Sequence, residues 1–385
     1  MSKKKKQDTA VENGSVTSED SAYEVASQLQ LMWWKFRKHK LAMIAMPILV
    51  ILYLSAIFAD FLTPALPTTR YTDLKDSPPM TVHWTDENGN RSAPFVCGTK
   101  TVANRETMKR ETVEDFDHKY YIKLFAHGVQ YNLLGFIPTD IHLFGIEGEG
   151  LDLNKFNFML MGSDRLGRDL YTRIMYGSRI SLSFGFVSII FTFIIGLTLG
   201  GLAGYLGGIV DNLIMRIIDV IMCIPTIPLW MALAAALPRS WTTYQIYLGM
   251  VLIMSLIGWT GLCRVIRGKI LSLREEDFVI AARLSGAPDW AIIRKHMIPS
   301  FLSYIIVNMT ISIPASILGE TSLSFLGLGL QEPAVSWGVL LSDAQKVAQI
   351  ANKPWLLWPA AWIIVTVLMY NFLGDGIRDA ADPYK

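Results

Sequence analysis

The sequence contains few cysteines and few charged residues, and each shortage excludes a class of protein. Only three cysteines occur in 385 residues, at Cys97, Cys223 and Cys263, and none forms a CxxC pair. A disulfide framework and a zinc ribbon both need cysteines in regular spacing. Charged residues make up 18% of the chain and the net charge is +2. The chain therefore lacks the broad basic surface with which proteins bind nucleic acid.

Sequence patterns of several enzyme classes are also absent. No GxxxxGK[ST] phosphate loop occurs, because the Gly268-Lys269 pair has Cys263 in place of the first glycine and is followed by Ile270. There is no HExxH or GxSG motif, and Asp375 has no second intramembrane aspartate near it to activate water. We predict that the chain has no catalytic residues, binds no metal and is not an enzyme.

Long hydrophobic runs are what the sequence does contain. Hydrophobic residues make up 51% of the chain, and six runs contain no Asp, Glu, Lys or Arg. A helix that crosses ~30 Å of hydrocarbon needs about 20 apolar residues. The six runs are 41–59, 180–204, 220–238, 241–263, 297–319 and 354–374. We predict an all-α polytopic membrane protein with six transmembrane helices.

The distribution of Lys and Arg predicts the orientation of these helices. Residues 1–40 contain eight of them and residues 264–299 contain seven. With six crossings the two segments lie on the same side, and the positive-inside rule makes that side cytoplasmic. Both termini are then cytoplasmic. The first run is not followed by a small-residue cleavage site, so we interpret it as an uncleaved anchor.

Four regions are expected along the chain. Residues 1–40 are expected to form a cytoplasmic tail, disordered over 1–22, followed by an amphipathic helix. The first transmembrane helix is 41–60, and an extracytoplasmic insert follows over 61–160. The remainder, 161–385, carries the other five transmembrane helices. The insert has short β-prone stretches separated by Pro, Gly and Asn, which predicts an α+β or mainly-β unit around a hairpin. Cys97 is its single cysteine, so a disulfide there would need another chain.

The basic segment between the fourth and fifth runs predicts a short helix, a turn and a second helix. Phe278, Ala281, Ala282 and Ser285 share one helix face. The Gly286-Ala287-Pro288 sequence ends the first helix and starts the next. Small residues on an exposed helix permit close approach by another protein. The alternative is a basic helix pair that rests on lipid headgroups.

Ala281, Ala282, Gly286 and Pro299 resemble the EAA loop of ABC-importer permeases, although Ile280 stands where that family has Glu. The resemblance implies that this segment is a cytoplasmic coupling helix held by an ATPase. The residues implied in coupling are Phe278, Ala281, Ala282, Arg283, Gly286, Ala287, Pro288, Asp289, Trp290, His296 and Pro299.

Other segments resemble the C-type permease subunit of the oligopeptide/dipeptide transport family, in a long form with an extended external insert. They are 162–169, 200–219, 319–338 and 371–383, and the match covers roughly 25–60 and 160–385. The resemblance implies a bacterial or archaeal cytoplasmic-membrane importer with a homologous second permease, two ATPases that carry ATP and Mg²⁺, and an extracytoplasmic substrate-binding protein. This chain itself would contact membrane lipid and bind no cofactor or nucleic acid.

The transported class implied by the resemblance is oligopeptides, and related systems carry oligosaccharides or nickel. An ion-coupled secondary carrier is the alternative from another class, but the hydrophobic runs contain almost no ionisable residues for ion coupling. Selectivity within the importers resides largely in the binding protein, so the sequence leaves the substrate open.

Two further sets of residues are predicted. Asp164, Arg165, Arg168 and Asp169, just outside the second run, are interpreted as an external structural clamp rather than a substrate site. Met222, Pro225, Pro228, Asn308 and Glu320 are candidates for the translocation path. Pro225 and Pro228 can bend the third run and expose carbonyl groups beside a pore. Glu320, before an expected turn over 321–330, either meets a peptide amine or forms structural hydrogen bonds.

Gly196, Gly200 and Gly204 recur at four-residue spacing on one face of the second run. Such a row lets a second helix approach closely, so we predict tight helix packing there.

Overall fold

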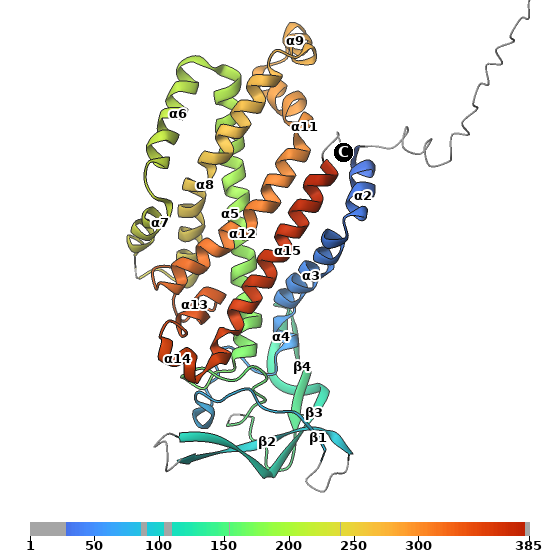
Figure 1. Ribbon diagram of the computed structural model, residues 1–385, viewed down its shortest axis with the longest axis vertical. Helices are drawn as coiled ribbons and strands as arrows, with labels where there is room; N and C mark the ends of the chain where they lie inside the picture. Colours follow the sequence, from blue (N-terminus) through green and yellow to red (C-terminus); the bar gives the residue numbers. More distant parts are fainter. Residues whose placement is uncertain (1–27, 86–90, 104–109, 154, 239, 382–385) are drawn as a thin grey trace, which may run out of the picture.

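The computed structural model describes residues 28–85, 91–103, 110–153, 155–238 and 240–381. The segment 1–22, for which the sequence predicts disorder, lies outside these residues. The described chain forms a bundle of long helices with a small β-sheet at one end, and α9 (Asp277–Leu284) lies at the opposite end (Figure 1). The predicted class, a helical membrane protein with a strand-containing insert after its first crossing, is confirmed.

Five helical stretches among the described residues are long and apolar enough to cross a membrane. They are α3 (Lys40–Ile57), α5 (Leu170–Leu206), α8 (Thr243–Leu273), α12 (Leu302–Phe325) and the joined η3 and α15 (Pro354–Leu357 and Trp358–Ala381). The side chain of Asp169 caps α5 by accepting hydrogen bonds from the backbone N–H groups of Tyr171 and Thr172. Thr242 and Gln245 form a capping box at the start of α8.

The third predicted crossing is not a single helix. The chain forms α6 (Gly208–Met222) and α7 (Thr226–Ala235), which are bent by 86° at the break between them. Pro225 has no backbone N–H and disfavours helical geometry in the residue before it, which ends α6 just upstream. Together the two helices are long and apolar enough to form one broken span or a re-entrant loop, so the described residues contain five candidate crossings, or six if this pair is counted. The bend expected at the prolines is present.

Shorter elements connect the long helices. They are α2 (Gln28–Lys38), α4 (Ala59–Leu62), η1 (Thr72–Leu74), α10 (Asp289–Ile292), the π-helical η2 (Ile293–Met297), α11 (Ile298–Ser300), α13 (Trp337–Ser342) and α14 (Val347–Asn352). The turn predicted to begin at Thr321 begins later, because α12 continues to Phe325 and the chain turns at Gly327, where φ is +75°. Glu320 therefore lies inside α12.

The insert after α4 contains a four-stranded sheet. Its strands β1 (His83–Thr85), β2 (Arg91–Ala103), β3 (Arg110–Leu133) and β4 (Ile137–Glu147) pair in sequence order, and each pair is antiparallel. Val96, Tyr120 and Ile146 are buried together with Phe158, which lies in the segment leading to α5. The strand-rich insert predicted from the sequence is confirmed.

The glycine row on α5 packs against α8. A Cβ atom on Gly200 would lie 2.7 Å from the carbonyl oxygen of Cys263, and one on Gly204 would lie 2.8 Å from that of Arg267. A Cβ on Gly196 would meet Leu262. Real Cβ atoms do not approach a carbonyl oxygen so closely, so glycine is what permits the contact. The predicted close packing is confirmed, with α8 as the partner.

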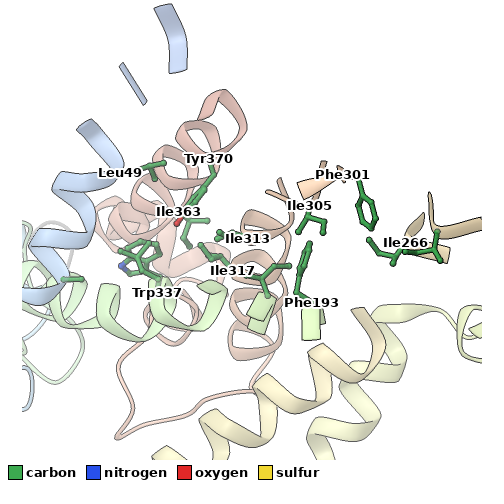
Figure 2. Packing of buried hydrophobic residues seen from close by; sticks show 14 of the residues in the cluster. Leu49, Phe193, Ile266, Phe301, Ile305, Ile313, Ile317, Trp337, Ile363 and Tyr370 are labelled. Carbon is green, nitrogen blue, oxygen red and sulfur yellow. The ribbon is translucent and has the colours of Figure 1, made fainter. Parts of the chain in front are cut away.

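The main core extends from α3, α5, α12, α13 and α15 to α8, α9 and α10. Figure 2 shows Leu49, Ile317, Ile363 and Trp337 from these helices in this core. Trp337 is fully buried, and its Nε1 donates a 3.2 Å hydrogen bond to the carbonyl oxygen of Ile174 on α5. The contact ties the segment after α12 to the start of the longest helix.

Candidate functional site

The helices α9 and α10, the turn between them, η2 and the start of α11 form a bracket (residues 277–299) at the end of the bundle opposite the sheet (Figure 1). Val279 and Ile292 are fully buried and belong to the main core. Leu284 is 83% exposed and Trp290 is 54% exposed. One side of the bracket is thus anchored in the bundle, and the other presents large apolar side chains outward.

Gly286 shapes the turn of the bracket. Its φ is +79°, in the left-handed region that other residues rarely adopt, and its amide donates a 3.0 Å bond to the carbonyl of Arg283. Ala287 then donates a 3.2 Å bond to the carbonyl of Ala282. These bonds close the end of α9 and direct the chain into α10, as the Gly-Ala-Pro pattern predicts.

The bracket is also tied to the end of α5. The hydroxyl of Tyr205 donates a 2.8 Å hydrogen bond to Oδ1 of Asp289, and the guanidinium of Arg283 lies 5.3 Å from the centre of the Tyr205 ring. Two of the residues predicted to act in coupling, Arg283 and Asp289, therefore meet at a third residue that the sequence analysis did not select. A tyrosine at the end of a transmembrane helix was the available signal.

The other predicted coupling residues lie on the exposed side of the bracket or at its edge. Ala282 and Ala287 are half-buried, and those exposed are Phe278, Ala281, Gly286, Pro288, Trp290, His296 and Pro299. All eleven predicted residues lie within the bracket, with the small residues beside its turn.

The opposite end of α5 carries an outer charge cluster, formed by Asp164, Arg168, Arg173 and Glu332. Nε of Arg168 lies 2.7 Å from Oδ2 of Asp164, and Nη1 of Arg173 donates to the same oxygen. Oε1 of Glu332 lies 2.5 Å from Arg168 and 3.0 Å from Arg173. Asp164, Arg168 and Arg173 are buried. Two arginines and two carboxylates thus balance one another.

The surroundings of Glu332 favour its charged form. Burial alone would raise the pKa of its carboxyl, but the hydrogen bond from Arg168 and the charges of Arg168 and Arg173 lower the pKa to about 2. The opposite holds for Asp169, where burial raises the pKa to about 6 against hydrogen bonds from Thr172.

The predicted clamp residues do not all act together. Asp164 and Arg168 pair within the outer charge cluster, whereas Asp169 caps α5 and Arg165 lies 3.4 Å from Asp343. The sequence analysis missed Arg173 and Glu332 as members. Glu332 lies 164 positions from Arg168, so local spacing carries no sign of this pairing. These ion pairs hold the start of α5 against the loop before α13.

A cavity of about 310 Å³ lies among α5, α7, α8 and α12. Its polar side chains are Thr192, Asn308, Ser312 and Ser316, and Trp230 and Met254 contribute apolar surface. Asn308 is thus the predicted path residue that lines a cavity. Met222, Pro225 and Pro228 lie instead at the break between α6 and α7, where they are exposed.

Glu320 faces the interior of this chain. It is fully buried, and its Oε1 accepts 2.8 Å hydrogen bonds from the hydroxyls of Ser324 and Ser336. Ser336 also caps α13 by accepting from the amide of Val339. Of the two roles considered for Glu320, these contacts support structural hydrogen bonding, because no open surface reaches the side chain.

One group of potential metal ligands occurs among the described residues. A ring nitrogen of His83, the sulfur of Cys97 and a carboxylate oxygen of Glu114 lie within 4.8 Å of one another. They come from three neighbouring strands, β1, β2 and β3, and His83 already contacts Glu114 at 2.9 Å. Imidazole, thiolate and carboxylate are the donors that zinc takes. The sequence analysis, which predicts no metal, did not connect these residues.

Two family models match the chain. The one described as binding-protein-dependent transport system inner membrane component matches residues 196–384, and the one described as N-terminal TM domain of oligopeptide transport permease C matches residues 27–79. The intervening residues 80–195, which include the sheet, are matched by neither.

Named relatives agree with these matches. The dipeptide transport system permease protein DppC of Bacillus subtilis is 40% identical over 224 residues, which are 58% of this chain and 68% of that protein. The oligopeptide transport system permease protein OppC of Haemophilus influenzae is 41% identical over 227 residues, 59% of this chain and 70% of that protein. A putative peptide permease protein of Brucella ovis is 37% identical over 252 residues, 65% and 80% respectively.

Proposed function

Since this chain belongs to the binding-protein-dependent transport permeases, among relatives of the oligopeptide and dipeptide permease C subunits, we propose that it forms half of the translocation path of an ATP-driven peptide importer. It would pair with a homologous second permease, engage two cytoplasmic ATPases and receive substrate from an extracytoplasmic binding protein. ATP and Mg²⁺ would be bound by the ATPases.

The observation that carries this proposal is the bracket. Val279 and Ile292 fix it to the core, while Leu284 and Trp290 project outward with a turn of small residues between them. Exposed apolar anchors beside small residues are suited to a groove on a partner protein. Closure of two ATPases around nucleotide would then move the bracket and switch the permease between inward-facing and outward-facing states.

Orientation follows from the same proposal. The bracket, α2 and the end of α15 lie toward one end of the bundle, and the sheet lies at the other (Figure 1). We place the bracket end in the cytoplasm, in line with the positive-inside distribution of Lys and Arg. The sheet then faces the side from which the binding protein delivers substrate.

The translocation path would pass the cavity beside Asn308. The hydroxyl and amide groups that line this cavity can form hydrogen bonds with the backbone of a peptide substrate, and Trp230 and Met254 can contact its apolar side chains. Oligosaccharides or nickel remain the other cargo classes. Uptake assays with the cognate binding protein and labelled di- to hexapeptides would identify the cargo, and uptake of a sugar or Ni²⁺ alone would overturn the peptide assignment.

Co-purification with the ATPases tests the bracket. Leu284→Asp, Ala282→Arg and Gly286→Trp should each lose most of the bound ATPase, because they place a charge or a bulky ring on the docking side. Val347→Asp, at an exposed position near the sheet end, is the matched control and should retain it. Full assembly and substrate-stimulated ATP hydrolysis in all three bracket variants would remove the bracket from the mechanism.

A further inference from the structure

The turn that joins β3 to β4 exposes large apolar side chains. Four of its five residues are apolar, Leu133, Leu134, Phe136 and Ile137 around Gly135, and Phe136 is 73% exposed. Hairpin turns that face water are usually built from Gly, Asn, Asp and Ser. This turn therefore presents hydrocarbon where a water-facing domain would place polar groups.

The backbone of the same hairpin adds a second observation. Leu134 and Phe125 both have φ of 55°, a region that large side chains rarely adopt. Both side chains are exposed, Phe125 by 63%. In water, glycine or asparagine would adopt this conformation with less strain and would expose less apolar surface. Phe125 packs on the ring of Phe61, whereas a large apolar side chain at Leu134, in the turn itself, is favourable only if it enters an apolar environment.

A groove on α3 and α4 ends at this hairpin. Its volume is about 520 Å³, and its almost wholly apolar wall is formed by Ile51, Leu54, Ser55, Phe58, Phe61, Leu62 and Leu133. The helical stretch from Ile51 to Leu62 is about 16 Å long at 1.5 Å per residue, roughly half of a ~30 Å hydrocarbon core. Since α3 is long and apolar enough to cross a membrane, we place the groove in the leaflet on the sheet side.

Contacts at the base of the hairpin fix its position against the membrane helices. The ring centres of Phe125 and Phe61 lie 6.3 Å apart. In His142 on β4, Nδ1 lies 3.0 Å from the carbonyl oxygen of Asp60 and Nε2 lies 3.0 Å from that of Val129. Asp60 is held in turn by Arg179 of α5, at 2.6 Å. Figure 1 shows β4 next to α4, where these contacts form.

We propose that the β3–β4 turn inserts into the sheet-side leaflet and that the groove between it and α3 binds one acyl chain of a membrane phospholipid. The exposed apolar surface of the turn is continuous, through Leu133, with the surface that α3 presents to lipid. Polar side chains follow immediately along the hairpin, where His127 pairs with Asp140 at 2.9 Å, and these suit the headgroup level. The insert is thereby held at the membrane surface.

Spin-label accessibility tests the insertion. The full chain with Cys223→Ser, which removes the exposed thiol, receives Phe136→Cys or, as a control, Lys155→Cys in the external segment. Both are labelled with a nitroxide and reconstituted in nanodiscs of phosphatidylethanolamine and phosphatidylglycerol. We expect the ratio of oxygen to nickel-chelate accessibility to be at least fivefold higher at position 136. Equal ratios would show that the turn is in water, and shielding from both reagents would show that protein covers it; either overturns the proposal.

Lipid retention tests the groove. Ser55→Trp fills it, whereas Ser55→Ala leaves it open. In native mass spectrometry of the purified chain, the wild type and Ser55→Ala should retain one phospholipid more than Ser55→Trp. Leu133→Ser removes the apolar side chain that the hairpin contributes to the groove, without adding bulk, and should lose the same lipid. This variant tests the groove independently if Ser55→Trp misfolds. Equal retention in all four proteins would exclude an acyl chain from the groove.

Discussion

Tyr205 and Asp289 are joined by a 2.8 Å hydrogen bond between residues that are 84 positions apart in the chain. The bond connects the last turn of α5 to the first turn of α10. The ring of Tyr205 also lies under the guanidinium of Arg283. The bracket is thus attached to the rest of the bundle by a polar bond as well as by the packing of Val279 and Ile292, and the proposed movement of the bracket would be passed on through both.

Removal of this bond should weaken the transfer of movement. Tyr205→Phe deletes the hydroxyl but keeps the ring under Arg283, and one partly buried hydrogen bond contributes about 1 kcal/mol. We expect substrate-stimulated ATP hydrolysis by the assembled transporter to fall several-fold while the ATPases stay bound. Asp289→Asn keeps an oxygen that accepts the bond and should remain near the wild type. Equal activity of Tyr205→Phe and the wild type would show that packing alone is sufficient.

Asp164 should be essential for folding. It pairs with both Arg168 and Arg173, and breaking a buried pair costs about 3–5 kcal/mol because a charge is left without compensation. Asp164→Asn should therefore lower the free energy of unfolding by about that amount in SDS titrations from detergent. Arg165→Ala removes an exposed partner of Asp343 and should cost less than about 1 kcal/mol. Similar losses for the two variants would contradict the assignment.

The contribution of Glu332 should depend on pH in a defined direction. Its pKa is lowered from 4.5 to about 2 in the folded chain, so its ion pairs stabilise the fold fully above about pH 4.5 and less as the pH falls toward 2. The difference in melting temperature between wild type and Glu332→Gln should be constant from pH 5 to 7 and should shrink below pH 4.5. A difference that grows on acidification would reverse the sign and refute the pairing.

Two glycines on the packed helices should respond differently to one added methyl group. A Cβ on Gly200 would meet the carbonyl oxygen of Cys263, whereas a Cβ on Gly268 meets nothing within 4 Å. Gly200→Ala should destabilise the chain by about 1–3 kcal/mol. Gly268→Ala, in the interior of α8, should be neutral or stabilising by up to about 1 kcal/mol. Unfolding curves of the two variants in the same detergent provide the comparison.

Local patterns in the sequence predict much of this fold. Charge-free runs locate the membrane helices, the glycine row predicts the packed face of α5, and Gly286 with Pro288 predicts the turn of the bracket. Each of these signals depends on residues close together in the chain. The break between α6 and α7 is only partly predicted, because prolines indicate a bend but not the angle.

Contacts between distant segments are not predictable in this way. Glu332 meets Arg173 across 159 positions, and Glu320 is buried because Ser336, from beyond the following turn, bonds to it. The extension of α12 past Thr321 was missed because Gly and Ser suggest a turn, whereas packing of Gly338 against Thr321 favours the helix. These outcomes depend on tertiary packing that overrides local preference.

The length of α5 has a further consequence. Its 37 residues extend for about 55 Å and contain no proline, so a single uninterrupted helix carries Arg173 of the outer charge cluster in its first turn and Tyr205 in its last. If the bracket moves with its ATPase, as proposed, a push at Asp289 would pass through Tyr205 and along this one helix to the outer charge cluster. In the proposed importer, the ATPase contact and the charge cluster at the far end would then move together, because both are attached to the same helix.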